Sequence, residues 1–411
     1  MKGCMVTYIK IIITLYINNA SPSREEGKKS MNKKTKSSLM IILITLPLFT
    51  LYLLLWPVPI QPPHWNAPQS DGYTGPHELN SRLAGMEFIE LGDYKQPEHI
   101  VYRENWLYAA MEDGEIIRVR PDGSESEVVV NTGGRPLGFD FDSEGALIIA
   151  DPLYGDHGGI LRVTNLGVGA EIELLTDSAD GDPISFADAV IVAENGLIYF
   201  SDASLLVKAK EIGDVGKAGE LDILANSSTG RVLEYNPITK QTRVLMTDLS
   251  FANGIALSED EEHLLINETG KYRVWKLDVN AENVSAFEQD ESAQILIDNL
   301  PGLPDNIMQG KEGRYWIGLI HPRNAFLDYS ANKPWLRSIA MRLPDFMLPK
   351  GNGHSHVIAI NELGNVLVDL QDSDGSYREI TGATETDDKL FFHHLNDLNT
   401  IGWIKTRDIE F

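Results

Sequence analysis

Beyond residue 78, hydrophobic residues occur in short alternating stretches, separated by turns rich in Gly, Asp, Glu and Asn. Residues 114–119 and 196–200 each show a turn glycine followed by such a stretch. Alternation with a period of two places successive side chains on opposite faces of a strand, and these turn residues favour tight hairpins. The pattern therefore predicts an all-β domain of antiparallel strands over residues 79–411.

A longer phrase repeats within this region: a leading motif, an apolar strand, a turn, and a second strand that ends near Asp or Glu. Six leading motifs occur, namely PEHIVY at 97, RPLGFDF at 135, FADAVIV at 186, FANGIAL at 251, LPDNIMQ at 303 and REITGA at 378. Six four-stranded units predict a six-bladed β-propeller, closed by residues 87–91 (EFIEL) pairing with the last unit. A pair of β-sandwiches is the alternative, but sandwiches do not require a phrase that recurs roughly every fifty residues.

An insertion interrupts the repeat near residues 324–352, where the pattern is apolar and partly helical. We expect this insertion to cover one face of the propeller or to touch a membrane.

The N-terminal region contains a long apolar run, residues 39–58, in which Thr45 and Thr50 are the polar members. A helix of twenty such residues crosses about 30 Å of hydrocarbon. Because lysines cluster at residues 33–36 and acidic sequence follows the run, we expect a single-pass anchor with a cytoplasmic N-terminus and the propeller on the outer (periplasmic, lumenal or extracellular) side. A cleaved signal peptide and a buried core helix are the alternatives, although no small-residue cleavage site follows the run.

The expected organisation has four parts. Residues 1–37 form a basic cytoplasmic leader, 38–60 a transmembrane anchor, 61–78 a linker rich in Pro, Gln and Asn, and 79–411 the propeller. Met31 begins a second basic leader and is an alternative start of the protein.

Charge and composition exclude several classes of function. The chain of 411 residues has a net charge of −25 although its leader is basic, so the remainder is strongly acidic and would repel nucleic acid. The single cysteine, Cys4, lies in the leader, which excludes disulfides, thiolate metal sites and a cysteine nucleophile from the propeller. The propeller region also lacks the GxSxG, P-loop, HExxH and dinucleotide-binding motifs.

The leading motifs carry the candidate chemistry. The inner strand of each blade begins at the central channel, so the polar residues beside these starts should face one another as a ring. The ring contains Glu98, Leu137, Asp188, Asn253, Asp305 and Asn306. Three carboxylates and two amides suit a hard cation, calcium before magnesium, which would also relieve like-charge repulsion. Alternatively, each motif is merely a turn, because Asp and Asn are common turn residues.

Several phrases resemble the strictosidine synthase-like, adipocyte plasma membrane-associated protein-like branch of the six-bladed calcium-dependent phosphotriesterase superfamily, which also includes paraoxonases and gluconolactonases. The phrases are FANGIALSEDEEHLLINET from 251, NLPGLPDNI from 299 with RYWIGL from 314, GRVLEYNPITKQTRVL from 230, and KPWLRSIAMRL from 333. In the hydrolytic relatives, the resemblance implies a channel calcium held by residues that match Glu98, Asn253 and Asp305, with Asn306 beside them.

The chain departs from the superfamily pattern at two places. Where the family usually has FAND, this chain has FADA, so that Asp188 replaces an Asn and Ala189 replaces an Asp. A carboxylate can still bind calcium, and Asp188 is kept as a ligand. Leu137 stands where paraoxonases carry a catalytic His, so a base of that kind is absent.

These observations predict a membrane-anchored, calcium-dependent hydrolase of lactones or aryl esters, in which the metal polarises the carbonyl and Asp305 is both ligand and base. Further candidate bases are the histidines His157, His321, His354, His356, His393 and His394. Two alternatives stay open. One is strictosidine synthase-type condensation of an amine with an aldehyde, with a catalytic Glu and no metal, and the other is a tethered propeller that binds a ligand or protein without chemistry.

Overall fold

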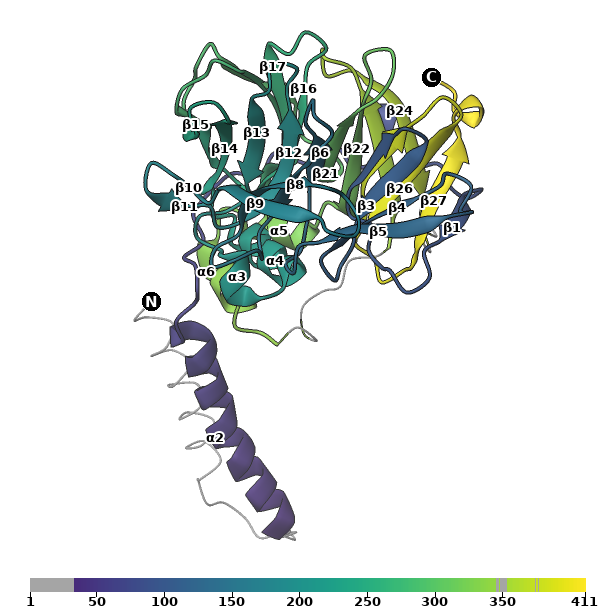
Figure 1. Ribbon diagram of the computed structural model, residues 1–411. Coiled ribbons are helices and arrows are strands. Elements are labelled where there is room, and N and C mark those ends of the chain that lie inside the picture. Colours follow the sequence, from purple (N-terminus) through teal and green to yellow (C-terminus); the bar gives the residue numbers. More distant parts are fainter. Residues whose placement is uncertain (1–32, 345–346, 348–352, 374, 376) are drawn as a thin grey trace, which may run out of the picture. The chain divides into compact units, whose positions relative to one another are not determined.

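The computed structural model describes residues 33–344, 347, 353–373, 375 and 377–411 (Figure 1). Most of the predicted basic leader and the alternative start at Met31 lie outside the described residues. The chain divides between Trp56 and Pro57 into two compact units.

The described part of the first unit is a helix, α2 (Lys33–Leu55), which contains Pro47. Most of its apolar side chains from Met40 onward are exposed, and the exposed fraction reaches 72% at Leu55. The predicted apolar run is therefore helical as far as Leu55. Among the described residues, no helix combines the length and the hydropathy that crossing a membrane requires.

The second unit is a six-bladed β-propeller, as the repeat predicted (Figure 1). The first blade contains β2 (Ile100–Arg103), β3 (Trp106–Ala110), β4 (Glu115–Val119) and β5 (Ser126–Asn131). The second contains β6 (Phe139–Phe141), β7 (Leu147–Asp151), β8 (Gly159–Thr164) and β9 (Glu171–Thr176). The third contains β12 (Ala187–Val192), β13 (Ile198–Asp202), β14 (Gly230–Asn236) and β15 (Gln241–Leu249), with β19 (Val284–Ser285) parallel to β15.

The remaining three blades follow the same order from the inner to the outer strand. The fourth contains β16 (Ala252–Leu257), β17 (His263–Glu268), β18 (Arg273–Asp278) and β20 (Ala293–Ile297). The fifth contains β21 (Gly302–Gln309), β22 (Tyr315–Pro322), β23 (Ser355–Ile360) and β24 (Val366–Asp372). The sixth contains β25 (Ile380–Glu385), β26 (Lys389–His394), β27 (Thr400–Lys405) and β1 (Glu87–Glu90). The short hairpin of β10 (Ser178–Ala179) and β11 (Asp182–Pro183) lies between the second and third blades. The 3-10 turns lie before β1 (η1, Gly75–His77), between β17 and β18 (η2, Thr269–Lys271) and after β27 (η4, Thr406–Asp408).

The ring closes through β1, which pairs antiparallel with β27 from Glu87 opposite Trp403 to Glu90 opposite Thr400 (Figure 1). The predicted closure is confirmed. Because the N-terminal strand completes the C-terminal blade, the two ends of the propeller chain are joined by a full set of strand pairings, and the ring has no open blade.

Helices cover one end of the propeller. They are α3 (Ala209–Ile212) and α4 (Val215–Ala225), which follow β13, and α5 (Ala325–Ser330) and α6 (Pro334–Ala340), which follow β22. Helices α3 and α6 both contact α4, and α5 contacts α6, so the four helices form one layer (Figure 1). The helical insertion near 324–352 was predicted, whereas α3 and α4 were not.

Three carboxylates at the ends of second strands explain why the repeat has an acidic residue there. Asp202 accepts hydrogen bonds from the backbone N–H groups of Ser185 (3.1 Å) and Phe186 (2.7 Å), just before β12. Asp151 and Glu268 receive equivalent bonds at the starts of the neighbouring leading motifs, from Arg135 N at 2.8 Å and from Ser250 N at 2.9 Å. Each carboxylate thus fixes the chain where an inner strand begins.

Asp202→Ala should lower the free energy of unfolding by about 3–5 kcal/mol, because it leaves the buried guanidinium of Arg231, whose Nε lies 3.0 Å from Asp202 Oδ2, without its charge partner. Chemical denaturation of the full chain measures the change. The control is Asp397→Ala, which removes the exposed ion pair with Lys95 and should leave the denaturation midpoint almost unchanged. Equal effects of both substitutions would contradict a structural role specific to Asp202.

Candidate metal centre in the central channel

The structure brings the predicted polar ring residues together at the inner strands. Asp188 lies on β12, Asn253 on β16, Asp305 and Asn306 on β21, and Glu98 two residues before β2. All five side chains are buried, with exposed fractions of 2–5%. The structure therefore favours the ring over isolated turns as the meaning of the leading motifs.

A bulge in three inner strands displays these side chains. The register shifts between Ala187 and Val190 on β12, Ala252 and Ile255 on β16, and Pro304 and Ile307 on β21. At each shift, two residues of the inner strand lie opposite one residue of the second strand, and the bulged pairs are Asp188–Ala189, Asn253–Gly254 and Asp305–Asn306. Bulges re-aim side chains and increase twist, which suits residues that must leave the sheet and turn to the axis.

Close packing between neighbouring inner strands makes one glycine necessary. A Cβ on Gly254 would lie 2.5 Å from the backbone N of Ile307 and 2.6 Å from Cα of Asn306. Any side chain at this position would push β21 away from β16. The glycine thus sets how closely Asn253 and Asp305 approach each other.

Hydrogen bonds link the ring members across blades. Asn306 Nδ2 donates to Glu98 Oε1 at 2.8 Å and to the Glu98 backbone oxygen at 3.1 Å. The Asn253 side chain is hydrogen-bonded to Asp305, and Asn267 Nδ2 donates to the backbone oxygen of Asp305 at 2.6 Å. The fourth, fifth and first blades are therefore held in register at the axis by side-chain amides.

The buried carboxylates of the ring are difficult to ionise without a positive charge beside them. Burial, followed by the negative charges of Glu98 and Asp305, raises the pKa of Asp188 well above its usual value. Burial and Glu98 likewise raise the pKa of Asp305, although the hydrogen bond from Asn253 opposes this. Burial raises the pKa of Glu98, and the nearby Arg135 lowers it again. These groups resist being ionised together.

Two fully buried oxygen atoms of the ring have no hydrogen-bond partner among the described residues, namely Glu98 Oε2 and Asn253 Oδ1. Such orphaned acceptors are rare in protein interiors and are typical of sites that take an ion or water. The three carboxylates of Glu98, Asp188 and Asp305 do not all place an oxygen atom within 4.8 Å of the other two, so they are spaced more widely than a compact cluster. The donor set of carboxylate and amide oxygens fits a calcium ion, which prefers several oxygens in a flexible geometry.

Two residues beside the polar ring, Arg135 and His99, were not predicted from the sequence. Arg135 is buried, and its guanidinium acts on Glu98, while its Nη2 has no partner among the described residues. His99 is also buried, and burial lowers its pKa to about 4, so it is neutral at pH 7. Both residues belong to leading motifs, but their side chains lack the carboxylate or amide oxygens from which the ring was predicted.

The other predicted positions have different surroundings. Leu137 does not join the polar set but packs in an apolar cluster with Phe186, Phe251 and Ile60, under α3, α4 and α6. Among the candidate bases, His393 lies near the polar ring. Its imidazole centroid is 5.7 Å from that of His99, and its Nε2 is 2.7 Å from Thr384 Oγ1. The remaining candidates have other partners or positions: His394 bonds the backbone oxygen of Thr400, His354 bonds Gln371, His356 bonds Asp369, His321 lies near Glu379, and His157 is exposed.

The apolar cluster covers the channel end where the ring lies. Phe186 and Phe251 each stand two residues before a ring member, and their rings meet edge to face at 5.2 Å. Helices α3 and α4 contribute Ala209, Ala218 and Ala225 to the same cluster. The polar ring is thus bordered by an apolar cluster, which we call the apolar cap.

Sequence comparisons identify the family. Two family descriptions match the chain, "Strictosidine synthase" over residues 188–282 and "Strictosidine synthase-like, N-terminal" over residues 75–119. Strictosidine synthase-like protein 4 of Arabidopsis thaliana is 34% identical over 333 residues, which cover 78% of this chain and 82% of that protein. This chain belongs to the strictosidine synthase-like family.

Two other proteins are also similar to this chain. Strictosidine synthase-like protein 7 of Arabidopsis thaliana is 39% identical over 263 residues, 62% of this chain and 65% of that protein. The adipocyte plasma membrane-associated protein of Salmo salar is 28% identical over 381 residues, 85% of this chain and 86% of that protein. The family resemblance predicted from the leading motifs is confirmed.

Solved structures support the fold of this family member. A gluconolactonase from Xanthomonas campestris has a TM-score of 0.54 at 16% identity, over 85% of this chain and 99% of the other. Regucalcin from Agrobacterium tumefaciens, described as a calcium-binding protein, has a TM-score of 0.51 at 12% identity, over 78% of this chain and 94% of the other. At such low identity the similarity establishes the propeller fold alone.

If the ring takes calcium, the affinity should fall by about 10- to 100-fold between about pH 7.5 and about pH 5.5. The pKa values of Asp188 and Asp305 are raised in the ion-free protein, so at acidic pH a proton must leave before the ion binds. Calorimetric titration of chelator-treated protein measures this dependence. Asp188→Asn should weaken its pH dependence, whereas Asp156→Asn, in an exposed loop, should not. A pH-independent affinity would argue against these carboxylates as the ligands.

Proposed function

We propose that this protein is a membrane-anchored, calcium-dependent hydrolase of lactones or aryl esters. The observation that carries the proposal is the pair of orphaned acceptors, Glu98 Oε2 and Asn253 Oδ1, buried beside Asp188 and Asp305 where four blades converge. An oxygen-lined, desolvated site of this kind suits a hard cation and a polar reacting group.

The ring residues have different proposed roles. A calcium ion held by Glu98, Asp188, Asn253, Asp305 and Asn306 would supply a positive charge that polarises a carbonyl and stabilises negative charge on its oxygen. Asn306 orients the Glu98 carboxylate through its 2.8 Å hydrogen bond, and Asn253 orients Asp305.

Asp305 is the proposed proton acceptor. Burial and the charge of Glu98 raise its pKa in the ion-free protein, and a bound calcium would keep its carboxylate ionised and able to accept a proton. It would take a proton from the attacking water and return it to the leaving oxygen. His99 and His393, whose pKa values burial lowers, are uncharged neighbours that do not add positive charge to the site.

The apolar cap supports a substrate with a hydrocarbon portion. Phe186, Phe251 and Leu137 are buried beside the polar ring, and they would contact the hydrocarbon part of a lactone or ester if the cap opened to admit it. The name of the Xanthomonas campestris neighbour, a gluconolactonase, agrees with lactone chemistry on this fold. Since fold similarity does not establish function, the assay decides.

Asp305→Asn should lower the turnover of lactones and phenyl acetate by about 10²- to 10⁴-fold, because it removes the base and one ligand charge. Turnover by the unchanged protein should disappear with a calcium chelator and return on addition of calcium. Asp156→Asn is the matched control and should retain full activity.

Other outcomes of the same assay would identify the alternatives. Metal-free, inert protein would support a binding propeller without chemistry. Metal-independent condensation of an amine with an aldehyde would support the strictosidine synthase-type reaction, and either result overturns the hydrolase proposal.

We also propose that the apolar run of residues 39–58, most of which lies in α2, anchors the protein in a membrane, with its N-terminus cytoplasmic. Support comes from its exposed apolar side chains, such as Ile44 and Leu48, which an aqueous environment would leave uncovered. The relative from Salmo salar carries the words plasma membrane-associated in its name.

Removal of residues 1–56 should move the protein from the membrane fraction to the soluble fraction. Ile44→Arg with Leu48→Arg should have the same effect, because each arginine at the centre of a span costs about 2.5–3.5 kcal/mol. Fractionation with an alkaline carbonate wash measures the distribution. Release of the unchanged protein by that wash alone would show that it is not integrally anchored.

A further inference from the structure

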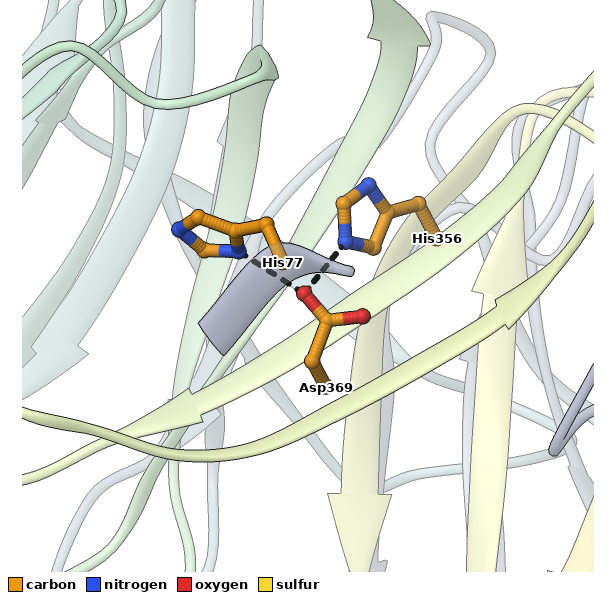
Figure 2. A group of neighbouring side chains, drawn as sticks. All are labelled: His77, His356 and Asp369. Atoms are coloured by element: carbon orange, nitrogen blue, oxygen red, sulfur yellow. Dashed lines mark hydrogen bonds and ion pairs between the residues drawn. The ribbon is translucent and has the colours of Figure 1, made fainter. Parts of the chain in front are cut away.

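A second cluster of ligating side chains lies away from the leading motifs (Figure 2). His77 comes from η1, His356 from β23 and Asp369 from β24. β23 and β24 are the two outer strands of the fifth blade, whereas Asp305 lies on its inner strand, β21. The cluster is therefore separate from the channel ring.

The cluster is more compact than the ring. Asp369 Oδ2 lies 2.8 Å from His77 Nδ1 and 2.9 Å from His356 Nε2, and one ligand atom from each residue lies within 4.8 Å of the other two. In the part of the chain that the structure describes, no other three ligand atoms of His, Cys, Asp or Glu meet this spacing. The two histidines converge on the same carboxylate oxygen from different segments (Figure 2).

The surroundings orient Asp369 for this contact. Gln371 Nε2 donates to Asp369 Oδ1 at 2.5 Å, and Asn80 Nδ2 donates to the same oxygen at 3.3 Å. Oδ1 is thereby occupied, and Oδ2 is left to face the two imidazoles. Hydrogen bonds of this kind hold metal-binding carboxylates in place, and loss of one typically costs about 10- to 100-fold in metal affinity.

Unpartnered polar atoms border the cluster. Tyr73 Oη is buried without a hydrogen-bond partner among the described residues, and its ring lies 5.8 Å from that of His356 and 5.0 Å from that of His354. The second nitrogen of His356, Nδ1, is also buried without a partner. An additional ligand oxygen at Tyr73 or from water would complete a four-coordinate site.

We propose that His77, His356 and Asp369 bind a divalent transition metal, with zinc as the best fit. Two neutral imidazoles and one carboxylate are typical zinc ligands, and the acidic, cysteine-free propeller offers no softer set. A tetrahedral zinc ion holds its ligand atoms about 3.3 Å apart, so the present contacts would open by about half an ångström. The metal would replace the two hydrogen bonds that now join the histidines to Asp369.

Such an ion would fasten the segment before the propeller to its fifth blade. His77 precedes the first strand, while His356 and Asp369 lie 279 and 292 positions later in the chain; the latter separation spans most of the ring. The side chains of Asn80 and Arg82 already hold this segment nearby, because both donate hydrogen bonds to the backbone oxygen of Asp369. The metal site is therefore a structural clamp rather than part of the channel chemistry.

The test is zinc titration of the full chain after chelator treatment, followed by calorimetry and elemental analysis in the presence of excess calcium. We expect one tightly bound zinc per chain and a higher thermal midpoint with zinc, because an ion that binds only the folded state stabilises it. Replacement of zinc by cobalt should give the intense visible absorption of a four-coordinate site.

Variants separate ligands from bystanders. His77→Gln and Asp369→Asn should each weaken zinc binding by more than the about 10- to 100-fold that loss of an outer partner costs. Gln371→Leu should fall within that range, and His157→Gln, an exposed histidine, should bind zinc normally. Asp305→Asn should also bind zinc normally, which keeps this test independent of the proposed hydrolase activity.

His77→Gln also guards against misfolding, because it alters a short turn outside the blades. No stoichiometric zinc in the unchanged protein would show that the cluster is only a hydrogen-bonded His–Asp–His group. Equal zinc loss in His157→Gln would show adventitious binding to surface histidines. Either result overturns the proposal.

Discussion

The burial of several carboxylates around one axis is the constraint on which the rest of the structure depends. Burial raises the pKa values of Glu98, Asp188 and Asp305, and the charge of Glu98 raises those of Asp188 and Asp305 further. A fold tolerates such a set only if amides, a cation or a buried guanidinium offset the charge. The chain supplies amides from Asn253 and Asn306 and a guanidinium from Arg135.

The machinery that positions this ring is repeated rather than unique. A second-strand carboxylate, such as Asp202, binds the backbone just before an inner strand, and a bulge then turns the following polar residues to the axis. The same motif places a large apolar residue two positions earlier, as Phe186 and Phe251 show, where it enters the cap. One short phrase therefore builds both the polar ring and its apolar cover.

Sequence reasoning predicted this arrangement well where the phrase repeats. Asp188, Asn253 and Asp305 occupy equivalent places in the repeat, with Asn306 directly after Asp305, so their convergence followed from the propeller itself. Leu137 occupies a similar place but is apolar, and it packs with the cap instead. Helix α4 was missed because only a narrow stripe of its residues is buried, namely Ala218, Gly219, Asp222 and Ala225, and a stripe of small residues leaves a weak hydrophobic period.

The sequence by itself determined the number of blades, the closing strand and the oxygen-rich character of the channel, because these depend on local periodicity and on a phrase repeated in order. Tertiary structure alone decided which oxygens lack a partner, how burial shifts the pKa values, and that His77 meets Asp369 292 positions away. Such contacts carry no local signature, since they arise when ring closure brings distant segments of the chain against one blade.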